Sequence, residues 1–179
     1  MAMDWRAASR GALAGAAAAG VWAAQQPLDK QVFDTGYDDV ELLGKSVVSG
    51  AAWYPVGLLM HLGNGAVFGA LYASVAHYAP IPSWLRGPLA GQVENFATWP
   101  LAQLVDRLHP RRGELEPLTG NRRALAQATW RHLLFGLVLG ELERRLNPRD
   151  EPFPAPLEDY ASSNGHGNLE HAVAGNPAS

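Results

Sequence analysis

The chain has 179 residues, a formal net charge of −3 at pH 7 and an isoelectric point near 6.0. This length fits one domain, and the slightly acidic balance offers no basic surface to nucleic acid. The absence of cysteine excludes disulfide frameworks, thiolate zinc sites and cysteine nucleophiles. The mean hydropathy of −0.10 is low for a protein with several membrane spans, although polar loops and a polar tail dilute the apolar segments.

Residues 7–26 predict a first membrane-spanning helix made mostly of small residues. Arg6 and Arg10 lie at its start, and Pro27 is expected to close it. A basic start, an apolar run and a Val21-Trp22-Ala23 end that could be cleaved are also typical of a secretory signal peptide. We favour a retained helix because three further membrane-like segments follow. An exported soluble domain left by cleavage stays the alternative.

Residues 28–52 form a polar connection with five carboxylates. They are Asp29, Asp34, Asp38, Asp39 and Glu41. We predict that these carboxylates lie in a solvated loop, because the spacing of a calcium-binding loop is absent. Within the connection, the segment DDVELLGKSV predicts a short helix with an acidic start, lying at the membrane interface.

The longest apolar stretch, residues 53–79, predicts a second spanning helix. Its only strongly polar side chains are His61, Asn64 and His77, and it exceeds the ~20 apolar residues that cross a hydrocarbon core. Aromatic residues near both ends suit the aromatic belts of a bilayer. Glycines recur every four residues beside His61, a small-residue stripe that lets helices pack closely in lipid. These glycines are Gly57, Gly65 and Gly69.

Two further helices are predicted over residues 84–108 and 121–146, separated by a loop rich in charged and turn residues. Pro100 is expected to kink the first of them. Residues 149–179 have the proline, glycine, serine and asparagine content of a disordered tail. We therefore predict an all-α fold, a four-helix transmembrane bundle over residues 1–148 followed by this tail.

The second and fourth predicted helices share a motif that indicates an internal duplication. HLGNGAVFG at residues 61–69 matches HLLFGLVLG at 132–140 in its His, Leu, Gly, Val and Gly. GALAG at 11–15 and GPLAG at 87–91 match more weakly at a similar spacing. We therefore predict two tandem helix pairs inserted in the same orientation, as parallel repeats. The further packing glycines are Gly11, Gly15, Gly87, Gly91, Gly136 and Gly140.

The orientation in the membrane is left undecided by the basic residues. Lysine and arginine are shared almost equally between the two predicted ends of the bundle. The positive-inside rule needs an excess on one side.

Polar side chains inside the predicted spans make up the candidate site, because such groups are costly in hydrocarbon. They are His61, Asn64, Glu94, Asn95, Arg131 and His132. In one reading they are structural: each histidine bonds a carbonyl of the neighbouring helix, and Arg131 neutralises Glu94 or extends to the interface. In the other, Glu94, His61 and His132 form a proton- or cation-binding cluster, since a histidine–carboxylate pair titrates near neutral pH.

The histidine–glycine motifs resemble a known family. An H-x-x-x-G-x-x-x-G-x-x-Y helix from His61 to Tyr72 and an H-x-x-x-G-x-x-x-G helix from His132 to Gly140 are similar to the YagU-like uncharacterised bacterial inner-membrane proteins. The likeness covers about residues 7–146. It implies location and helix count but no mechanism.

We expect neither an enzyme nor a cofactor or metal site. The sequence lacks a nucleophile elbow, a phosphate-binding loop and a paired metal motif, and one histidine on each of two helices is little support for bis-histidine haem. The first expectation is a structural or accessory membrane protein that has the lipid bilayer as its partner, or a homo-oligomer held by its glycines. The alternative is a small transporter or a proton- or ion-conducting protein that uses the buried histidines and glutamate.

Overall fold

The computed structural model of the chain describes residues 4–148, and the regular structure in that range is entirely helical. The predicted all-α fold is therefore confirmed. The long helices are α1 (Trp5–Phe33), α3 (Trp53–Val75), α4 (Ser83–Thr98) and α6 (Arg122–Leu146), and the short ones are α2 (Asp39–Val47) and α5 (Ala102–Leu108). The predicted disordered tail, residues 149–179, lies outside the described residues.

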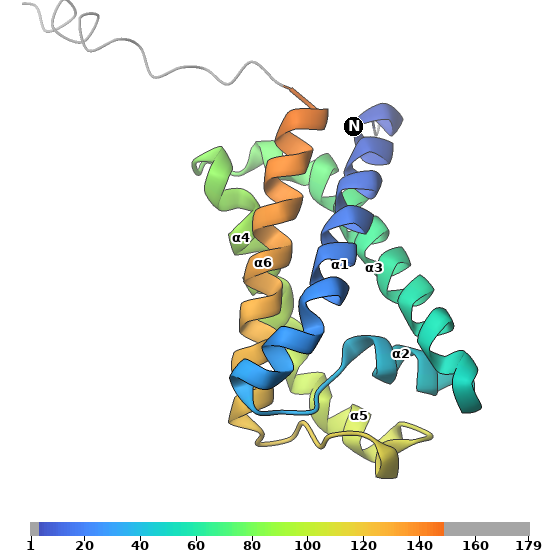
Figure 1. The fold of residues 1–179 in the computed structure, drawn as a ribbon. Helices are drawn as coiled ribbons and strands as arrows, with labels where there is room; N and C mark the ends of the chain where they lie inside the picture. The colour runs from blue at the N-terminus through green and yellow to red at the C-terminus, as the bar shows by residue number, and fades with distance from the viewer. Residues whose placement is uncertain (1–3, 149–179) are drawn as a thin grey trace, which may run out of the picture. The chain divides into compact units, whose positions relative to one another are not determined.

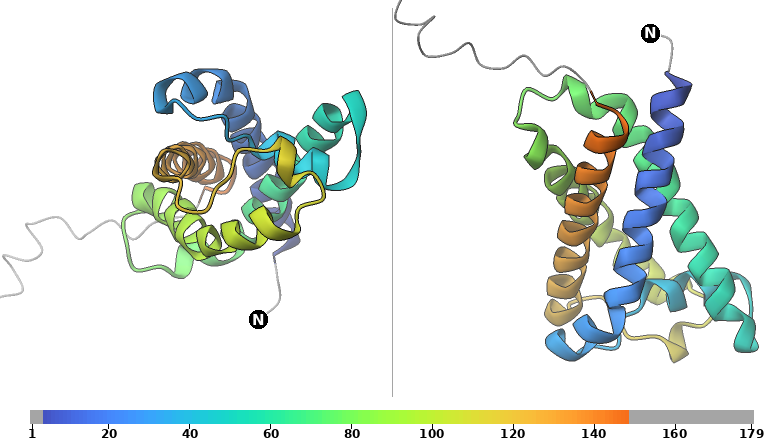
Figure 2. Two further views of the ribbon diagram at one scale, coloured as in Figure 1. Left: turned by 90° about the horizontal axis from the view of Figure 1, so that it is seen from below. Right: turned by 45° about the horizontal axis from the view of Figure 1, so that its top comes forward.

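The long helices alternate in direction along the bundle. In Figure 1, α1 and α4 descend from the end that holds the N-terminus, while α3 and α6 rise toward it. Figure 2 shows α6 flanked by α1 and α4, with α3 on the far side of α1. At the upper end, Asn147 donates to the Ala7 carbonyl and Arg10 to the Leu146 carbonyl. The opposite end is covered by α2, α5 and the loop that precedes α6.

Prolines set the helix boundaries differently from the prediction. Pro27 does not close α1, which continues to Phe33 because the residues beyond the proline are held by side-chain contacts, including an ion pair between Lys30 and Asp38. Pro100 does more than kink its helix. It lies in a 3-10 turn, Trp99–Leu101, that separates α4 from α5.

Glycines bring α1 and α3 into backbone contact. A methyl group placed on Gly15 would lie 2.0 Å from the Gly65 carbonyl oxygen, and one on Gly69 would lie 2.1 Å from the Gly11 carbonyl oxygen. Any larger residue would force the helices apart. Gly57 makes the same kind of contact with α2, where the Val40 carbonyl oxygen would lie 1.9 Å from an added methyl.

A second glycine seam joins α4 to α6. A methyl group on Gly87 would lie 2.2 Å from the Gly136 carbonyl oxygen, and one on Gly91 would lie 2.4 Å from the His132 carbonyl oxygen. Gly140 closes the seam against Gly87, with 3.2 Å between an added methyl and the Gly87 Cα. The nine glycines singled out in the sequence thus all lie at helix–helix contacts.

The interior of the bundle is built mainly from small side chains. Ten of the sixteen buried hydrophobic residues among residues 4–148 are alanine. Four of the other six form one cluster, which consists of Trp22, Tyr72, Phe135 and Leu139. Large apolar side chains instead face outward, with Leu59, Val67 and twenty others exposed. The apolar surface therefore lies mostly on the outside of the bundle.

By length and composition, one helical stretch in the described part of the chain could cross a membrane. It is Gly50–Tyr78, which contains α3. The other long helices are less apolar, because α1 consists largely of alanine and glycine and α6 carries arginines near both of its ends. This criterion supports one of the four predicted spans.

Candidate functional site

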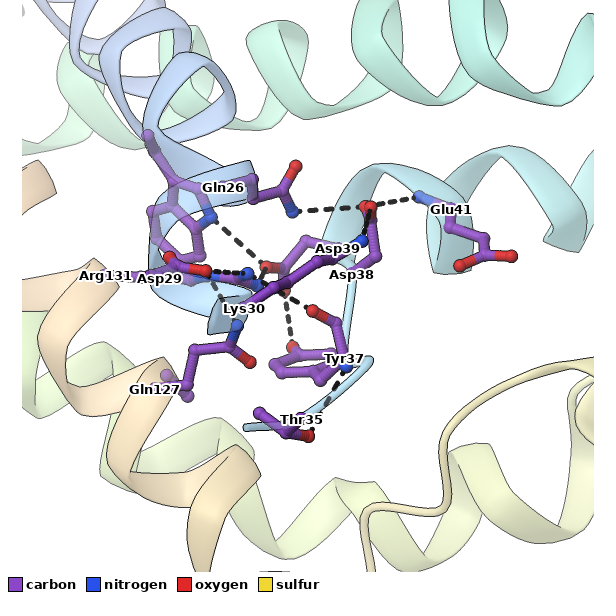
Figure 3. Close-up of polar contacts among 12 residues, drawn as sticks. Gln26, Asp29, Lys30, Thr35, Tyr37, Asp38, Asp39, Glu41, Gln127 and Arg131 are labelled. Carbon is purple, nitrogen blue, oxygen red and sulfur yellow. Dashed lines mark hydrogen bonds and ion pairs between the residues drawn. The ribbon is translucent and has the colours of Figure 1, made fainter. Parts of the chain in front are cut away.

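Arg131 lies at the centre of a polar cluster where α1, α6 and the start of α2 meet (Figure 3). Its side chain is 0% exposed and that of Asp29 is 1% exposed. Its Nε and Nη2 donate to the two oxygens of Asp29, each at 2.6 Å, and its Nη1 donates to Asp39 Oδ2 at 2.7 Å. This fork-to-fork geometry is the strong form of the arginine–carboxylate pair. Both predictions for Arg131, neutralisation by Glu94 and extension to the interface, are wrong.

Further donors complete the hydrogen bonding of the two aspartates. Gln127 Nε2 donates to Asp29 Oδ1 at 2.7 Å, Trp22 Nε1 donates to Asp39 Oδ2 at 3.2 Å, and the Tyr37 hydroxyl donates to Asp39 Oδ1. The predicted solvated loop is therefore wrong for Asp29 and Asp39. The physical reason is that α1 runs past its proline and carries Asp29 into the bundle.

Of the other three carboxylates of the connection, Asp38 and Glu41 are partly buried, with side chains 12% and 25% exposed. Asp38 pairs with Lys30 at 2.5 Å and caps α2 by accepting from the Glu41 N–H. Glu41 pairs with Lys45 at 2.8 Å. Asp34, whose side chain is 82% exposed, fits the prediction of a solvated carboxylate.

The charge state of the connection follows from its neighbours. Burial alone would raise the pKa of Asp39, but the positive charge of Arg131 and the hydrogen bond from Tyr37 outweigh it, so that the pKa is lowered. Burial, and then the adjacent Asp39 carboxylate, raise the pKa of Tyr37 well above its usual value. At neutral pH, Asp39 is thus an anion and Tyr37 a neutral hydrogen-bond donor.

A cavity of about 250 Å³ adjoins this cluster, bounded by residues of α1, α2, α3, α4 and α6. Four of the six residues predicted for the site line it together: His61, Asn64, Glu94 and His132. Trp22 and Asp39, which were not predicted for the site, line it as well. The cavity therefore joins the predicted histidine–glutamate group to the arginine cluster.

The two histidines of the cavity differ in their bonding. His132 Nε2 lies 2.5 Å from Glu94 Oε2, and its Nδ1 lies 2.7 Å from the Ala128 carbonyl oxygen of its own helix. His61 lines the cavity from α3, and its Nε2 is buried without a hydrogen-bond partner. The predicted bond to a carbonyl of the neighbouring helix is therefore wrong for His132, whose ring nitrogen meets a carbonyl of its own helix. For His61 this bond stays a prediction.

Trp22 separates the two histidines. Its ring meets His61 with 5.1 Å between centroids and His132 with 4.7 Å, edge-on in both cases. The same indole donates its N–H to Asp39. Trp22 is the one aromatic residue of the segment 7–26. This was the sequence signal for its role, because a ring among alanines and glycines fills a space that its neighbours leave open.

Asn95 and Asn64 have different surroundings. Asn95 is 1% exposed and its Nδ2 donates to Thr129 Oγ1 at 3.2 Å, which ties α4 to α6. This bond fits the structural reading of the buried amides. Asn64 is exposed at the rim of the cavity.

Chemically, the cavity offers an ion pair, an unpaired histidine nitrogen and aromatic walls. Among residues 4–148, no group of three or more His, Asp or Glu side chains is arranged to hold a metal ion. The arrangement suits the binding of a proton or of a small polar molecule.

Comparison with known proteins adds no identity: no family model, no curated protein and no solved structure matches the chain. The resemblance to the YagU-like proteins stays a prediction.

Proposed function

We propose that the chain is a multi-pass membrane protein whose α1, α3, α4 and α6 cross the bilayer as one glycine-seamed bundle, with a structural or accessory role and no enzymatic activity. The observation that carries the proposal is the distribution of side chains by size. The buried residues are mostly alanine, and twenty-two large hydrophobic residues are exposed. Exposed apolar area is unfavourable in water by roughly 25 cal/mol per Å². The same apolar area has no such free-energy cost when it faces lipid.

The distribution of charge supports the same proposal. Asp, Glu, Lys and Arg are absent from residues 11–28, 46–85 and 95–105, and residues 124–140 contain only Arg131, which is fully buried. At ~1.5 Å per helical residue, the run 11–28 is about 27 Å long. This length is close to the ~30 Å of a hydrocarbon core.

Tandem parallel repeats, α1–α3 and α4–α6, are part of the proposal. The first helices of the two pairs run in one direction and the second helices in the other (Figure 1). Both pairs have a glycine seam, and the motif histidines flank the same tryptophan. The seams differ by one helical turn, since Gly15 meets the Gly65 carbonyl whereas Gly91 meets that of His132. A slip of one turn after duplication accounts for this difference.

The location that we propose is the bacterial inner membrane, on the strength of the resemblance to the YagU-like proteins. The glycine seams in residues 4–148 are occupied within the chain, so a homo-oligomer would have to use the outer apolar faces. The polar cluster around Arg131 would act as internal glue between α1 and α6.

The test compares two valines that are equally exposed in the structure. Val67 on α3 is 63% exposed and Val47 on α2 is 60% exposed. If lipid surrounds α3, Val67→Asp places a charge in hydrocarbon at a cost of roughly 2.5–3.5 kcal/mol, whereas Val47→Asp lies outside the spans. We expect Val67→Asp to lower the amount of protein that resists carbonate extraction of membranes, and Val47→Asp to leave it unchanged. Equal behaviour of both variants, or release of the unchanged chain by carbonate, would refute the proposal.

A second candidate function, conduction of protons or cations, is favoured by the ion pair inside the cavity. Glu94 is 37% exposed there while it pairs with His132. A group that is both paired and accessible could exchange a proton with the cavity. In liposomes loaded with a pH-sensitive dye, Glu94→Gln should abolish a flux that Glu114→Gln, a change of an exposed carboxylate outside the cavity, leaves intact. Equal fluxes with and without the protein would exclude this candidate.

A further inference from the structure

We propose that the cavity between the histidines and the arginine cluster is a binding site for a small organic cation, specifically a primary alkylammonium ion. The proposal rests on the balance of charge, the aromatic walls, the unpaired histidine nitrogen and the size of the cavity. It shares its cavity with the second candidate function but requires no flux.

The charges in and beside the cavity sum to a negative value. Asp29, Asp39 and Glu94 supply three carboxylates, while Arg131 and His132 supply at most two positive charges. One negative charge therefore stays uncompensated even when His132 is protonated. This excess of negative charge favours a cation and opposes an anion.

Aromatic rings surround the cavity on several sides. Phe135 packs edge to face against both Trp22 and Phe68, with ring centroids 6.1 Å and 5.5 Å apart. Tyr37 lines the cavity beside the polar cluster. Aromatic faces attract ammonium groups through their quadrupoles, and their apolar bodies suit an alkyl chain. The walls therefore match both parts of an alkylammonium ion.

The unpaired nitrogen of His61 favours a ligand that carries a hydrogen-bond donor. His61 is 8% exposed, it lines the cavity, and its Nε2 has no hydrogen-bond partner. In the tautomer that carries its proton on Nδ1, the buried Nε2 has a free lone pair, which can accept a hydrogen bond from a ligand. A primary ammonium group brings three N–H donors, one for this nitrogen and others for Glu94. A quaternary ammonium brings none.

The dimensions of the cavity limit the ligand to a small molecule. Its volume of about 250 Å³ is below the ~300–1,000 Å³ of sites for drug-sized ligands. Asn64 and Thr98 are exposed at its lining and mark the side from which a ligand would enter. A chain of about four carbons is accordingly the probe of choice.

The experiment measures binding to the full-length protein in detergent by isothermal titration calorimetry. The probes are n-butylammonium, tetramethylammonium, butyrate and 1-butanol, which separate charge, donor capacity and apolar body without any change to the protein. We expect saturable binding of n-butylammonium with an affinity at least tenfold above that for tetramethylammonium, and no measurable binding of butyrate. Butanol binding as tightly as n-butylammonium, or the absence of binding by every probe, would overturn the proposal. The second of these outcomes would mean that water alone fills the site.

Variants then locate the binding. Glu94→Gln and His61→Leu should each weaken n-butylammonium at least tenfold, while Glu114→Gln and His77→Gln, matched changes outside the cavity, should not. Unchanged binding in both cavity variants would overturn the assignment to this cavity. If a cavity variant fails to fold, as judged by circular dichroism, the probe series on the unchanged protein still decides. Binding of n-butylammonium without proton flux refutes the conduction candidate and supports the binding site. Proton flux without binding refutes the binding site and supports conduction.

Discussion

Removal of the buried guanidinium should be the most damaging single change in the bundle. Arg131→Met keeps a long apolar side chain but deletes the charge that three charge-assisted contacts of 2.6–2.7 Å direct at Asp29 and Asp39. Because Asp29 is 1% exposed, its carboxylate would be left in the interior without a counter-charge. Loss of one partner from a buried pair costs roughly 3–5 kcal/mol. We expect a loss of stability of that order.

The assay is unfolding of the purified protein by sodium dodecyl sulfate in mixed micelles, followed by far-ultraviolet circular dichroism. Arg144→Met, which removes an exposed arginine from the same helix, is the matched control and should stay near the unchanged protein. A double variant with Asp29→Asn should be more stable than the sum of the single effects predicts, because it no longer buries that lone charge. A loss below about 1 kcal/mol for Arg131→Met, or additive single effects, would refute the reasoning.

Three further predictions use the same assay. Gly65→Leu should destabilise the protein by at least ~1–3 kcal/mol through overpacking, because even an added methyl would lie 2.6 Å from the Gly15 carbonyl oxygen. Gly63→Leu is the control and should be neutral, because Gly63 faces open space. Equal effects of the two changes would contradict the close contact of α1 and α3 at the glycine seam. Asn95→Ala should cost about 1–3 kcal/mol because it deletes the bond between α4 and α6, and a neutral result would exclude the structural reading. Because the pKa of Asp39 is lowered in the folded protein, its contribution is present above the unfolded pKa of about 3.9 and is lost as pH falls through the lower folded value. Asp39→Asn should therefore flatten the stability profile below about pH 4, and an unchanged profile would reject that assignment.

The helices and their seams were accessible from the sequence because both depend on local spacing. Glycines four residues apart lie on one face of a helix, so Gly65 and Gly69 had to meet a neighbour closely. The length of the apolar stretch likewise predicted the long helix α3, whatever helices it packs against. The register of each seam was not accessible, since the spacing within one helix carries no information on which carbonyl it meets.

The polar cluster was only half predictable. A lone arginine in an apolar segment requires an acid, and Arg131 was recognised as needing one. Its partner Asp29 lies 102 residues away, beyond a proline that suggested the end of the helix. Local rules place a carboxylate after Pro27 in solvent, and only tertiary packing brings it inside. The cavity between Glu94 and His61 was likewise not predictable from local rules, because it is formed by the packing of several helices.

The central claim is that four helices cross the membrane, and cysteine labelling tests it most directly, because the chain has no cysteine of its own. Single replacements at Ser9, Ser49, Ser83, Glu114 and Val67 would be treated with an impermeant thiol reagent in intact cells and in inverted membrane vesicles. If four helices cross the membrane, positions 9 and 83 react from one side, positions 49 and 114 react from the other, and position 67 reacts only after denaturation. Labelling of all five positions from one side would contradict four membrane spans. In that case position 67 would also react without denaturation, because Val67 is 63% exposed when no lipid covers it.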